Sequence, residues 1–482
     1  MNAAGILDDI ICAPASGSGG AIGIVRVSGN GCLQLIDRVV QFRSGAASDS
    51  PGFRLKFGVV PDLDEVLVGI FRTPHSYTGE DMAEISCHAS SYIVEELLGR
   101  LCAAGCRMAG PGEFTRRAYT AGKMDLSQAE AVADLIAADS MASHKLAFSQ
   151  LRGAYSKKLR SLREQMVELA ALLELELDFS EEDVEFADRR KLDSLARETL
   201  SECERLADSF RLGNAFKKGI PVAIAGPVNS GKSTLLNALL GEERALVSDI
   251  PGTTRDTVEE ILVLNGVAYR FIDTAGLRDT TDVVERMGIE RAVSQIDKAA
   301  VIVVLLDSSA PEDELRKVVS SVNSHIKDDS RVIWVRSKAD LLGSVAAPFT
   351  KTVHSVDGSG QNRLPVHENR AFCERLGIPE AIDLSARSGQ GLDELKAAIC
   401  KDDAQRLAAS EGVLVSNQRH QAALLAAAEA LHRFLDGIAS GVPSELLAED
   451  LRAATSSLGE IFGAITHQDI SSLIFSRFCI GK

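Results

Sequence analysis

One segment constrains the fold of this chain more than any other. Residues 226–233 have the sequence GPVNSGKS, which fits the pattern GxxxxGK[ST]. The strand-like run PVAIAG precedes the segment and the helix-like run STLLNALLG follows it, and the pattern requires this context. Glycines let backbone N–H groups turn toward phosphates, and the N-terminus of the helix adds positive potential. The segment therefore predicts a phosphate-binding loop, with Lys232 at the β- and γ-phosphates of a nucleotide and Ser233 as a ligand of Mg²⁺.

Two further motifs contain residues suited to contacts with the γ-phosphate. DIPGTTRD offers the hydroxyl of Thr254 to Mg²⁺ and the γ-phosphate, although an ordinary Pro-Gly turn would have the same residues. RFIDTAG places Asp273 and Gly276 at a strand end. There the carboxylate can hold the water shell of the metal, and the glycine N–H can contact the γ-phosphate.

Two more motifs are suited to the base of the nucleotide. SKAD ends a strand-like run, and its Asp340 is placed to accept hydrogen bonds from N1 and N2 of guanine. LSARSGQG adds Ser385 and Ala386, whose backbone can contact the guanine oxygen. GTPases usually have Asn where this chain has Ser337, and the shorter serine cannot make the same amide contacts. The order and spacing of these motifs favour GTP over ATP, with a lower affinity for guanine expected from Ser337.

The residues expected for hydrolysis also depart from the Ras pattern. Leu277 stands where Ras-like enzymes have the Gln that orients the attacking water. Asn229 in the phosphate loop is the residue at which one class of GTPases binds K⁺ instead of using an arginine finger. Glu285 can orient the water, but its spacing alone favours a solvated carboxylate on a helix.

The length of 482 residues predicts about three domains. Strand-like and helix-like runs mix over residues 1–123, which predicts an α+β domain. Residues 124–215 and 401–482 are rich in Ala and Leu and predict helices. Strands and helices alternate over residues 216–400, which predicts a doubly wound α/β sheet. The simplest architecture is this α/β domain inserted into a helical domain.

Composition excludes several classes of protein. The apolar fraction of 45% and charged fraction of 25% are ordinary for globular chains. The net charge of −16 disfavours a nucleic-acid coat over the whole surface, but not a local basic patch. No apolar run is long enough to span a bilayer, and no secretory or transit segment is evident at the N-terminus. The nine cysteines form no CxxC pair, so we expect reduced thiols and a cytoplasmic location.

Strings throughout the chain resemble the tRNA-modification GTPases of the MnmE (TrmE) family. These strings are GIVRVSG, PHSYTGEDMAEISCH, AGPGEFTRRAY, GKMDLSQAEAVADLI, LDFSEED, GPVNSGKSTLLNAL, VSDIPGTTRD, DTAGLRD and the terminal FCIGK. The resemblance implies a dimeric, K⁺-stimulated GTPase that works with the flavoprotein MnmG, which supplies the FAD. Together they would add a carboxymethylaminomethyl or aminomethyl group to C5 of the wobble uridine of certain tRNAs, using a one-carbon unit from a tetrahydrofolate.

The resemblance also implies roles for individual residues. Ser233 and Thr254 would hold Mg²⁺, and Asn229, Ser248, Ile250 and Thr253 would surround K⁺. Glu285 matches the water-orienting glutamate of the family and would act in catalysis with Lys232. The full set of implied GTP contacts is Asn229, Ser230, Gly231, Lys232, Ser233, Thr234, Ser248, Asp249, Ile250, Pro251, Gly252, Thr253, Thr254, Asp273, Thr274, Ala275, Gly276, Ser337, Lys338, Asp340, Ser385 and Ala386.

The folate site implied by the resemblance lies far from these motifs in the sequence. It comprises Arg26, Glu84, Lys123 and Lys482, with Glu84 chosen over the nearby Glu80. Cationic side chains suit a ligand with a glutamate tail, although the residues alone would also fit ordinary surface charges. Cys479 would by itself be an inert small hydrophobe. Its place in the terminal motif implies instead a part in the modification of tRNA.

Two alternatives stay open at this point. Arg152, Lys157, Lys158, Arg160 and Arg163 form either an RNA-contacting face or a solvated helix face, because basic residues without interleaved aromatics are weak evidence of RNA binding. The chain could also be a GTP-dependent switch or ribosome-assembly factor with a non-catalytic N-terminal binding module. Such a switch has no need for a terminal Cys-x-Gly-Lys motif.

Overall fold

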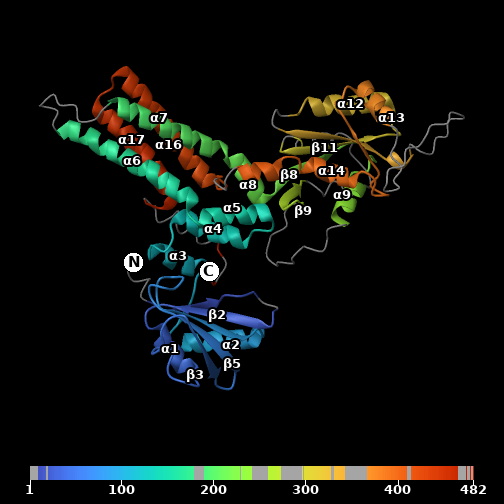
Figure 1. The fold of residues 1–482 in the computed structure, drawn as a ribbon. Helices are drawn as coiled ribbons and strands as arrows, with labels where there is room; N and C mark the ends of the chain where they lie inside the picture. The colour runs from blue at the N-terminus through green and yellow to red at the C-terminus, as the bar shows by residue number, and fades with distance from the viewer. Residues whose placement is uncertain are drawn as a thin grey trace. The chain divides into compact units, whose positions relative to one another are not determined.

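The computed structural model describes residues 9–17, 20–178, 189–227, 229–241, 259–272, 296, 298–326, 330–341, 366–409, 414–464, 474, 478 and 481 (Figure 1). The chain divides into two compact units. One comprises Met1–Ala137, Ala147–Asp208 and Gln418–Lys482, and the other Ala138–Leu146 and Ser209–Asn417. In the described part of the chain, no helix is long and apolar enough to cross a membrane.

The N-terminal region is a seven-stranded sheet in the order β3-β4-β5-β6-β2-β1-β7. Its pairings are antiparallel except for β1 with β7. The α+β prediction for this region is confirmed. Its elements are β1 (Ile11–Pro14), β2 (Ile22–Ser28), α1 (Cys32–Val39), β3 (Gln41–Phe42), β4 (Arg54–Val60), β5 (Asp64–Phe71), β6 (Met82–His88), α2 (Ser91–Ala103), β7 (Arg107–Met108) and α3 (Glu113–Thr120).

At β4 and β5, described helices cover one face of this sheet and leave the other open. On β5, Val66, Val68 and Ile70 are buried and belong to the same core as residues of α1 and α2. The residues between them point the other way, and Leu67 is 42% exposed. This alternation is the period of two expected of a half-buried strand, and it leaves an apolar face of the sheet uncovered within the described part of the chain.

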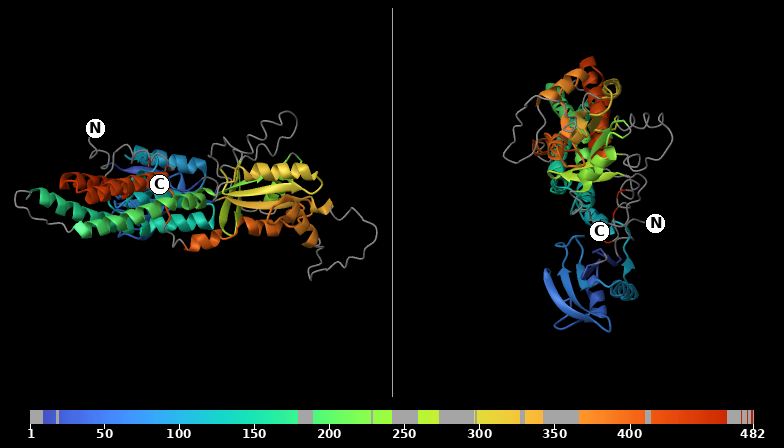
Figure 2. Two further views of the ribbon diagram at one scale, coloured as in Figure 1. Left: turned by 90° about the horizontal axis from the view of Figure 1, so that it is seen from above. Right: turned by 90° about the vertical axis from the view of Figure 1, so that its right-hand side faces the viewer.

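Long helices follow, as the Ala- and Leu-rich composition predicts. In α16 the buried positions recur every three or four residues, for example at Leu424, Ala427, Leu431 and Phe434. The helices α6, α7, α16 and α17 pack side by side along their lengths, which the view from above shows (Figure 2). The helices of this region are α4 (Leu126–Ile136), α5 (Met141–Leu151), α6 (Ala154–Asp178), α7 (Arg189–Asp208), α16 (Gln418–Ser440) and α17 (Ser444–Phe462).

The second unit contains a six-stranded sheet in the order β13-β12-β11-β8-β10-β9. All neighbours are parallel except β9 and β10, which form a hairpin that the sequence analysis did not predict. Its elements are α8 (Phe210–Lys218), β8 (Ile220–Ala225), α9 (Lys232–Gly241), β9 (Glu260–Leu264), β10 (Val267–Phe271), β11 (Val301–Asp307), α12 (Glu312–Asn323), β12 (Arg331–Ser337), the 3₁₀ helix η4 (Ala339–Leu341), α13 (Val366–Leu376), β13 (Ile382–Leu384), α14 (Leu392–Ile399) and α15 (Asp403–Ala409).

Helices cover both faces of this sheet, which confirms the doubly wound prediction. Every residue of β11 is buried. Val303 and Leu305 join one core with α9 and α14, whereas Ile302, Val304 and Leu306 join the opposite core with α12 and α13. A parallel strand buried on both faces has this continuous apolar sequence.

This second unit extends beyond the range 216–400 expected for the α/β domain. It also includes residues 209–215, 401–417 and 138–146. Asp403 of α15 accepts hydrogen bonds from Tyr269 of β10 at 2.8 Å and from Arg331 of β12 at 2.7 Å. Because Asp403 is only 2% exposed, these bonds hold α15 against the sheet.

Candidate functional site

The carboxyl ends of four parallel strands meet at one edge of the second sheet. Ala225, the last residue of β8, is paired with Val304 of β11. Asp307 at the end of β11 is paired with Ser337 at the end of β12, and Ser337 is in turn paired with Leu384 at the end of β13. The residues after these strands therefore leave the sheet at the same edge, where ligands bind in open α/β sheets.

The loop after β8 has the backbone that the phosphate-loop prediction requires. Gly226 has φ +151°, and a Cβ there would lie 2.8 Å from the carbonyl oxygen of Leu305. Asn229 and Gly231 have φ +65° and +95°, so the chain turns through the left-handed region before α9 begins. The hydroxyl of Ser230 is buried and has no hydrogen-bond partner among the described residues. Ser233 and Thr234 lie in the first turn of α9.

Lys232, the first residue of α9, folds back over this loop. Its Nζ donates hydrogen bonds to the carbonyl oxygens of Gly226 at 2.8 Å and Pro227 at 2.7 Å. Burial lowers the pKa of the ammonium group. The charge thus lies at the loop that turns into the N-terminus of α9, where an anionic phosphate would gain most from it.

The predicted base-reading residues follow β12 and β13. Asp340 is exposed within η4, whereas Ser337 is buried. Ser385 is also buried, and its backbone N–H and carbonyl bond to Gln390 and Gly389 at 3.0 Å each. These bonds close a tight turn directly after β13, and Ala386 lies in it, half-buried.

The sequence analysis did not predict two ion pairs that lie at this edge. Lys338 Nζ lies 2.5 Å from Oδ2 of Asp307, and Arg336 makes a two-pronged pair with Asp383 at 2.5 and 2.7 Å. The second pair is buried and joins β12 to β13 directly beside the predicted guanine site. An Asp or Arg at the end of a parallel strand is the signal that could have pointed to them, because such ends converge.

Many of the predicted nucleotide and metal residues lie outside the described residues. These are Ser248, Asp249, Ile250, Pro251, Gly252, Thr253, Thr254, Asp273, Thr274, Ala275, Gly276 and Glu285. Leu277 lies outside them as well, as do Cys479 and Lys482 of the terminal motif. The roles of all of these residues stay predictions.

The predicted folate residues come together in the N-terminal domain. Arg26 and Glu84 are direct partners on the neighbouring strands β2 and β6. Arg26 donates to Glu84 Oε1 from Nε at 3.0 Å and from Nη2 at 2.7 Å, and its Nη1 donates to the carbonyl oxygen of Gly481 at 3.1 Å. The rings of Tyr77 and Phe114 lie 5.5 and 5.6 Å from the guanidinium. Arg26 therefore links the sheet to the C-terminal tail.

Glu80, the alternative to Glu84, takes part in a different cluster. It accepts hydrogen bonds from Ser28 at 2.9 Å and from Arg117 at 3.2 Å. Arg117 is only 1% exposed and also contacts Glu113 and Asp9. Glu80 is thus engaged by a buried arginine, whereas Glu84 faces Arg26. The sequence analysis did not predict this cluster, although Glu80 lies within the string PHSYTGEDMAEISCH and Glu113 and Arg117 lie within AGPGEFTRRAY.

The tail is fixed at its two described ends. Phe478 is buried against Leu126 and Ala129 of α4. At Gly481, which has φ +98°, a Cβ would lie only 1.9 Å from the carbonyl oxygen of Pro14. No residue with a side chain fits there without movement of the backbone.

Lys123 lies against the loop between β5 and β6. Its Nζ donates to the carbonyl oxygen of Pro74 at 2.8 Å, and a Cβ on Gly79 would lie 3.5 Å from its side chain. The structure gives no direct contact between Lys123 and Arg26. Both nevertheless border the stretch from Pro74 to Glu84 that supplies Tyr77 and Glu80.

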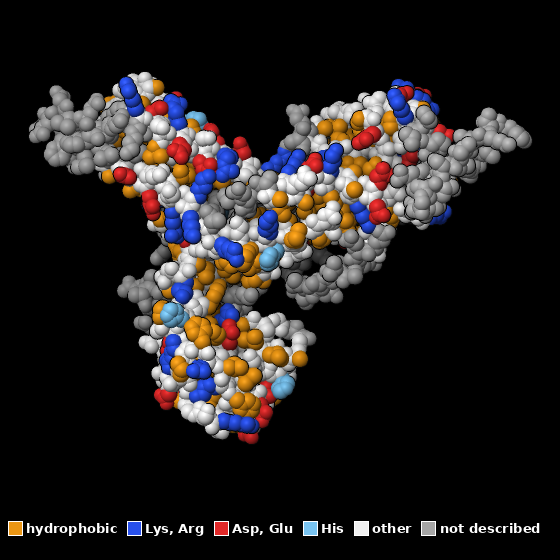
Figure 3. Space-filling model, viewed as in Figure 1, with side chains coloured by type: hydrophobic (Ala, Val, Ile, Leu, Met, Phe, Trp, Pro, Cys, Tyr) orange, Lys and Arg blue, Asp and Glu red, His pale blue; other side chains and the backbone are white. Residues whose placement is uncertain are grey.

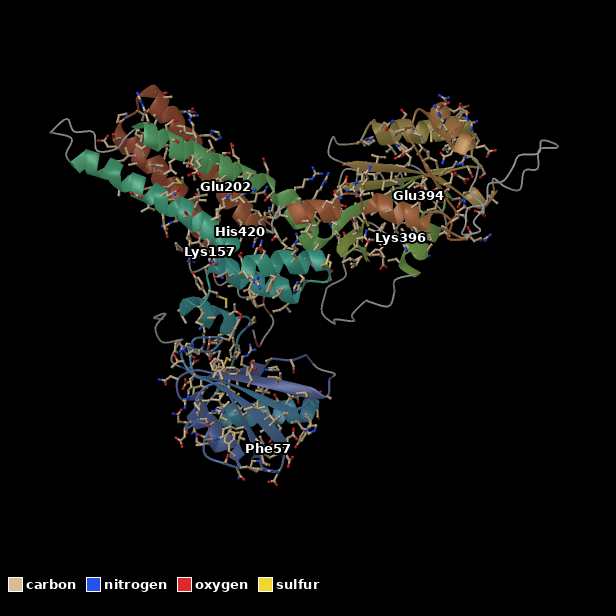
Figure 4. The ribbon with its side chains drawn as sticks, viewed as in Figure 1. Phe57, Lys157, Glu202, Glu394, Lys396 and His420 are labelled. Carbon is tan, nitrogen blue, oxygen red and sulfur yellow. The ribbon has the colours of Figure 1, made fainter. Side chains whose placement is uncertain are left out.

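Three of the five basic residues between 152 and 163 already have protein partners. Lys158 pairs with Glu202, Arg160 with Asp125, and Arg163 donates to a carbonyl oxygen of α17. Arg152 lies 4.4 Å from the centre of the Phe148 ring, an aromatic contact that the sequence analysis did not anticipate. Lys157 is exposed near the start of α6 (Figure 4). Lys and Arg side chains gather on the surface near the start of α6 (Figure 3).

Comparison with known proteins gives consistent matches along nearly the whole chain. Residues 10–123 match the model described as GTP-binding protein TrmE N-terminus, and residues 126–479 match the MnmE helical domain. The tRNA modification GTPase MnmE of Bacteroides thetaiotaomicron is 42% identical, covering 98% of this chain and 99% of that protein. The proteins of the same name from Bacteroides fragilis and Porphyromonas gingivalis are each 43% identical and cover 98% of this chain, with 99% and 98% of their own lengths matched.

A phosphate loop at the carboxyl edge of a doubly wound sheet, with a base-reading motif two strands away, defines a P-loop GTPase. With the matches to both flanking regions, the chain belongs to the MnmE family of tRNA modification GTPases. The family resemblance inferred from the sequence is thereby confirmed. Among solved structures, the G domain of the T. maritima FeoB iron transporter is 25% identical, covering 39% of this chain and 99% of that chain with a TM-score of 0.26.

Proposed function

We propose that this chain is a K⁺-stimulated GTP hydrolase that works with the flavoprotein MnmG in the cytoplasm. Together they would install a carboxymethylaminomethyl or aminomethyl group at C5 of the wobble uridine of certain tRNAs. The observation that carries the proposal is the contact of Arg26 with both Glu84 and the carbonyl oxygen of Gly481. A GTPase that acted only as a switch would have no need to hold its terminal tail on a remote N-terminal domain.

The residues of the phosphate loop fit a nucleotide with Mg²⁺. The close approach at Gly226 leaves no room for a side chain, and the buried hydroxyl of Ser230 lacks a described partner. Lys232 would bind the β- and γ-phosphates, and Ser233 with Thr254 would hold Mg²⁺, whose charge neutralises the phosphate oxygens during hydrolysis. We propose Glu285 as the residue that orients the attacking water, because Leu277 offers no polar atom.

A K⁺ ion would supply the charge that an arginine finger supplies elsewhere. Asn229 is exposed on the phosphate loop and has an amide oxygen, which is a suitable ligand for this cation. We propose that Ser248, Ile250 and Thr253 complete the site. Replacing KCl by NaCl at constant ionic strength should slow GTP hydrolysis strongly, whereas equal rates in the two salts would remove the K⁺ mechanism.

The N-terminal cluster fits a folate. Glu84 can accept hydrogen bonds from the N–H groups of the pterin ring, and Lys123 with Lys482 would bind the carboxylates of the glutamate tail. Arg26 would contact the folate from the side of its guanidinium that faces Glu84, while the same guanidinium holds the terminal tail. A bound 5-formyl- or methylene-tetrahydrofolate would supply the one-carbon unit, and Cys479 belongs to the same tail.

Removal of residues 479–482 tests this function directly. Loss of the modified uridine with unchanged GTP turnover is the expected result, because the deletion leaves the GTPase unit intact. The control is Lys232→Ala, which should abolish GTP turnover while Arg26 and Glu84 stay paired. Normal modification by the deleted protein would contradict the proposal and favour a GTP-dependent switch or assembly factor.

We propose that the uncovered face of the N-terminal sheet joins two copies of the chain into a homodimer. Leu55 and Leu67, on the neighbouring strands β4 and β5, are 66% and 42% exposed, and Phe57 of β4 is the direct cross-strand partner of Leu67 (Figure 4). Exposed apolar faces of this kind mark interfaces. Leu55→Glu should yield a monomer in light scattering, whereas Leu446→Glu, at a 54% exposed leucine of α17, should remain dimeric.

A further inference from the structure

Lys338 contacts the end of β11 through its side chain and the next residue, Ser308, through its backbone. Its Nζ lies 2.5 Å from Oδ2 of Asp307, and its carbonyl oxygen accepts a hydrogen bond from the hydroxyl of Ser308 at 3.3 Å. The backbone of Lys338 has φ +58°, which is uncommon for a residue with a side chain. A strained backbone of this kind persists where the surroundings fix it. The side chain of Lys338 is 34% exposed at the carboxyl edge of the sheet.

Asp307 is itself held rigidly. Its Oδ1 accepts hydrogen bonds from the backbone N–H of Ser309 at 2.9 Å and from the hydroxyl of Ser309 at 2.7 Å. Burial alone would raise the pKa of this carboxyl, but the bonds from Lys338 and Ser309 outweigh it and hold the pKa below its usual value. The carboxylate is therefore a fixed, charged anchor on β11.

The side chain of Ser337 does not provide a comparable charged anchor. It is 3% exposed, and its hydroxyl donates to the carbonyl oxygen of Leu306 at 3.4 Å. A serine has one hydroxyl hydrogen, whereas an asparagine has two donors and an acceptor. The hydroxyl of Ser337 is directed at β11 and makes only a long hydrogen bond there. The charged contact between Lys338 and Asp307 is therefore the closer side-chain tie between this segment and β11.

We propose that Asp307 is a positioning residue for recognition of the guanine base, which it serves by fixing Lys338. Held in this way, the methylene stem of Lys338 forms one wall of the purine pocket, while Asp340 accepts hydrogen bonds from N1 and N2 of the base. Asp307 touches neither the nucleotide nor the metal. The inference rests on the proposed binding of GTP and adds the residue that compensates for Ser337.

The test compares affinities for GDP and IDP, which lacks the N2 amino group, in the full-length protein. Asp307→Asn keeps the size of the side chain and its bonds to Ser309 but removes the charge that attracts Lys338. We expect both nucleotides to bind about tenfold more weakly, equal to about 1.4 kcal/mol, with the GDP to IDP ratio unchanged because Asp340 still reads the base edge. Asp313→Asn, at an exposed carboxylate of α12, is the matched control and should leave both affinities unchanged.

A second substitution separates positioning from a general structural role. Ser337→Asn supplies the missing amide, so we expect tighter GDP binding and a smaller effect of Asp307→Asn in this background. Lys338→Met keeps the stem but removes its charge, and it should weaken GDP binding as Asp307→Asn does. The lone tryptophan, Trp334 of β12, reports whether each variant is folded.

Each result has a definite meaning. If the wild-type protein binds GDP and the Asp307→Asn variant binds it with equal affinity, the inference is overturned while the proposed function stands. Loss of the GDP to IDP ratio, or an equal effect of Asp307→Asn with and without Ser337→Asn, would show collapse of the loop and would overturn it too. A folded wild-type protein that binds no guanine nucleotide would overturn the proposed function and this inference together.

Discussion

The two candidate sites of this molecule are assembled in opposite ways. At the GTPase edge, consecutive parallel strands end side by side, so Ala225, Asp307, Ser337 and Leu384 meet through the sheet register. In the N-terminal domain, Arg26 and Glu84 are neighbours across strands, but Gly481 comes from the other end of the chain. The first site follows from the topology of its sheet. The second requires docking of a remote segment, and it should therefore be the easier one to dismantle.

The largest expected effect comes from the buried charges beneath each site. Arg117→Met would remove the buried arginine that pairs with Glu113, itself 3% exposed, and it should cost about 3–5 kcal/mol of unfolding free energy. Arg336→Met should cost a similar amount because it isolates Asp383. Hydrogen exchange of β2 and β6 should report the loss of stability in Arg117→Met. Unfolding in urea, followed by the fluorescence of Trp334, should report the loss in Arg336→Met.

These two variants should act on different parts of the chain. Arg117→Met should leave the Trp334 transition unchanged, and Arg336→Met should leave exchange in β2 and β6 unchanged. Arg197→Met, which removes an exposed ion pair with Asp193, should change neither measurably. A shift of both probes in either variant would mean that the two sites unfold as one.

The second prediction concerns the loss of stability in acid at α4, the helix against which Phe478 of the tail packs. Burial alone would raise the pKa of Glu130 on α4, but the contacts with His420 and Arg419 outweigh it and lower the pKa to about 2. A carboxyl with a lowered pKa stabilises the fold above its unfolded value, near 4.5, and this stabilisation is lost as the pH falls toward 2. The loss should reach about 3 kcal/mol.

Glu130→Gln provides the measurement. Its deficit in unfolding free energy relative to wild type should be largest at neutral pH and should shrink between pH 4.5 and 2. Far-UV circular dichroism at several urea concentrations measures it, because most of the long helices belong to this unit. A deficit that stays constant across this range would show that the charge of Glu130 contributes nothing.

A third, smaller effect is expected for the tail itself. Gly481→Ala places a methyl group against Pro14 and imposes a left-handed backbone that costs about 1–2 kcal/mol in other residues. The tail should detach, and formation of the modified uridine should fall about tenfold, with GTP turnover unchanged. Gly99→Ala, where nothing lies within 4 Å, is the control. Equal rates for both variants would mean that docking of Gly481 is not needed.

The contrast between the sites also explains what the sequence could reveal. The phosphate loop and the strand ends were predictable because their residues lie within short motifs whose geometry is local. That Arg26 and Glu84 belong to one site was expected only through resemblance to a family, and their direct pairing was not predicted. The pair of Asp307 with Lys338 and the cluster around Arg117 were missed, because each joins segments that only the sheet register brings together. The hairpin of β9 and β10 was missed because its strands are short and its second strand looks like the other parallel ones.

The smallest effect is expected at Lys157, which belongs to neither of the two candidate sites. Its side chain is exposed on α6, and the structure gives it no ion pair within the described part of the chain. If this face contacts tRNA, Lys157→Ala should reduce the slope of log affinity against log salt by about 0.7–0.9, the value for one phosphate contact. Stability should not change, because no packing is lost. Arg370→Ala on α13 is the control, since this exposed side chain pairs with Glu374 in the GTPase unit. An unchanged slope for Lys157→Ala would mean that this lysine only faces solvent and would favour tRNA contact through the proposed flavoprotein partner.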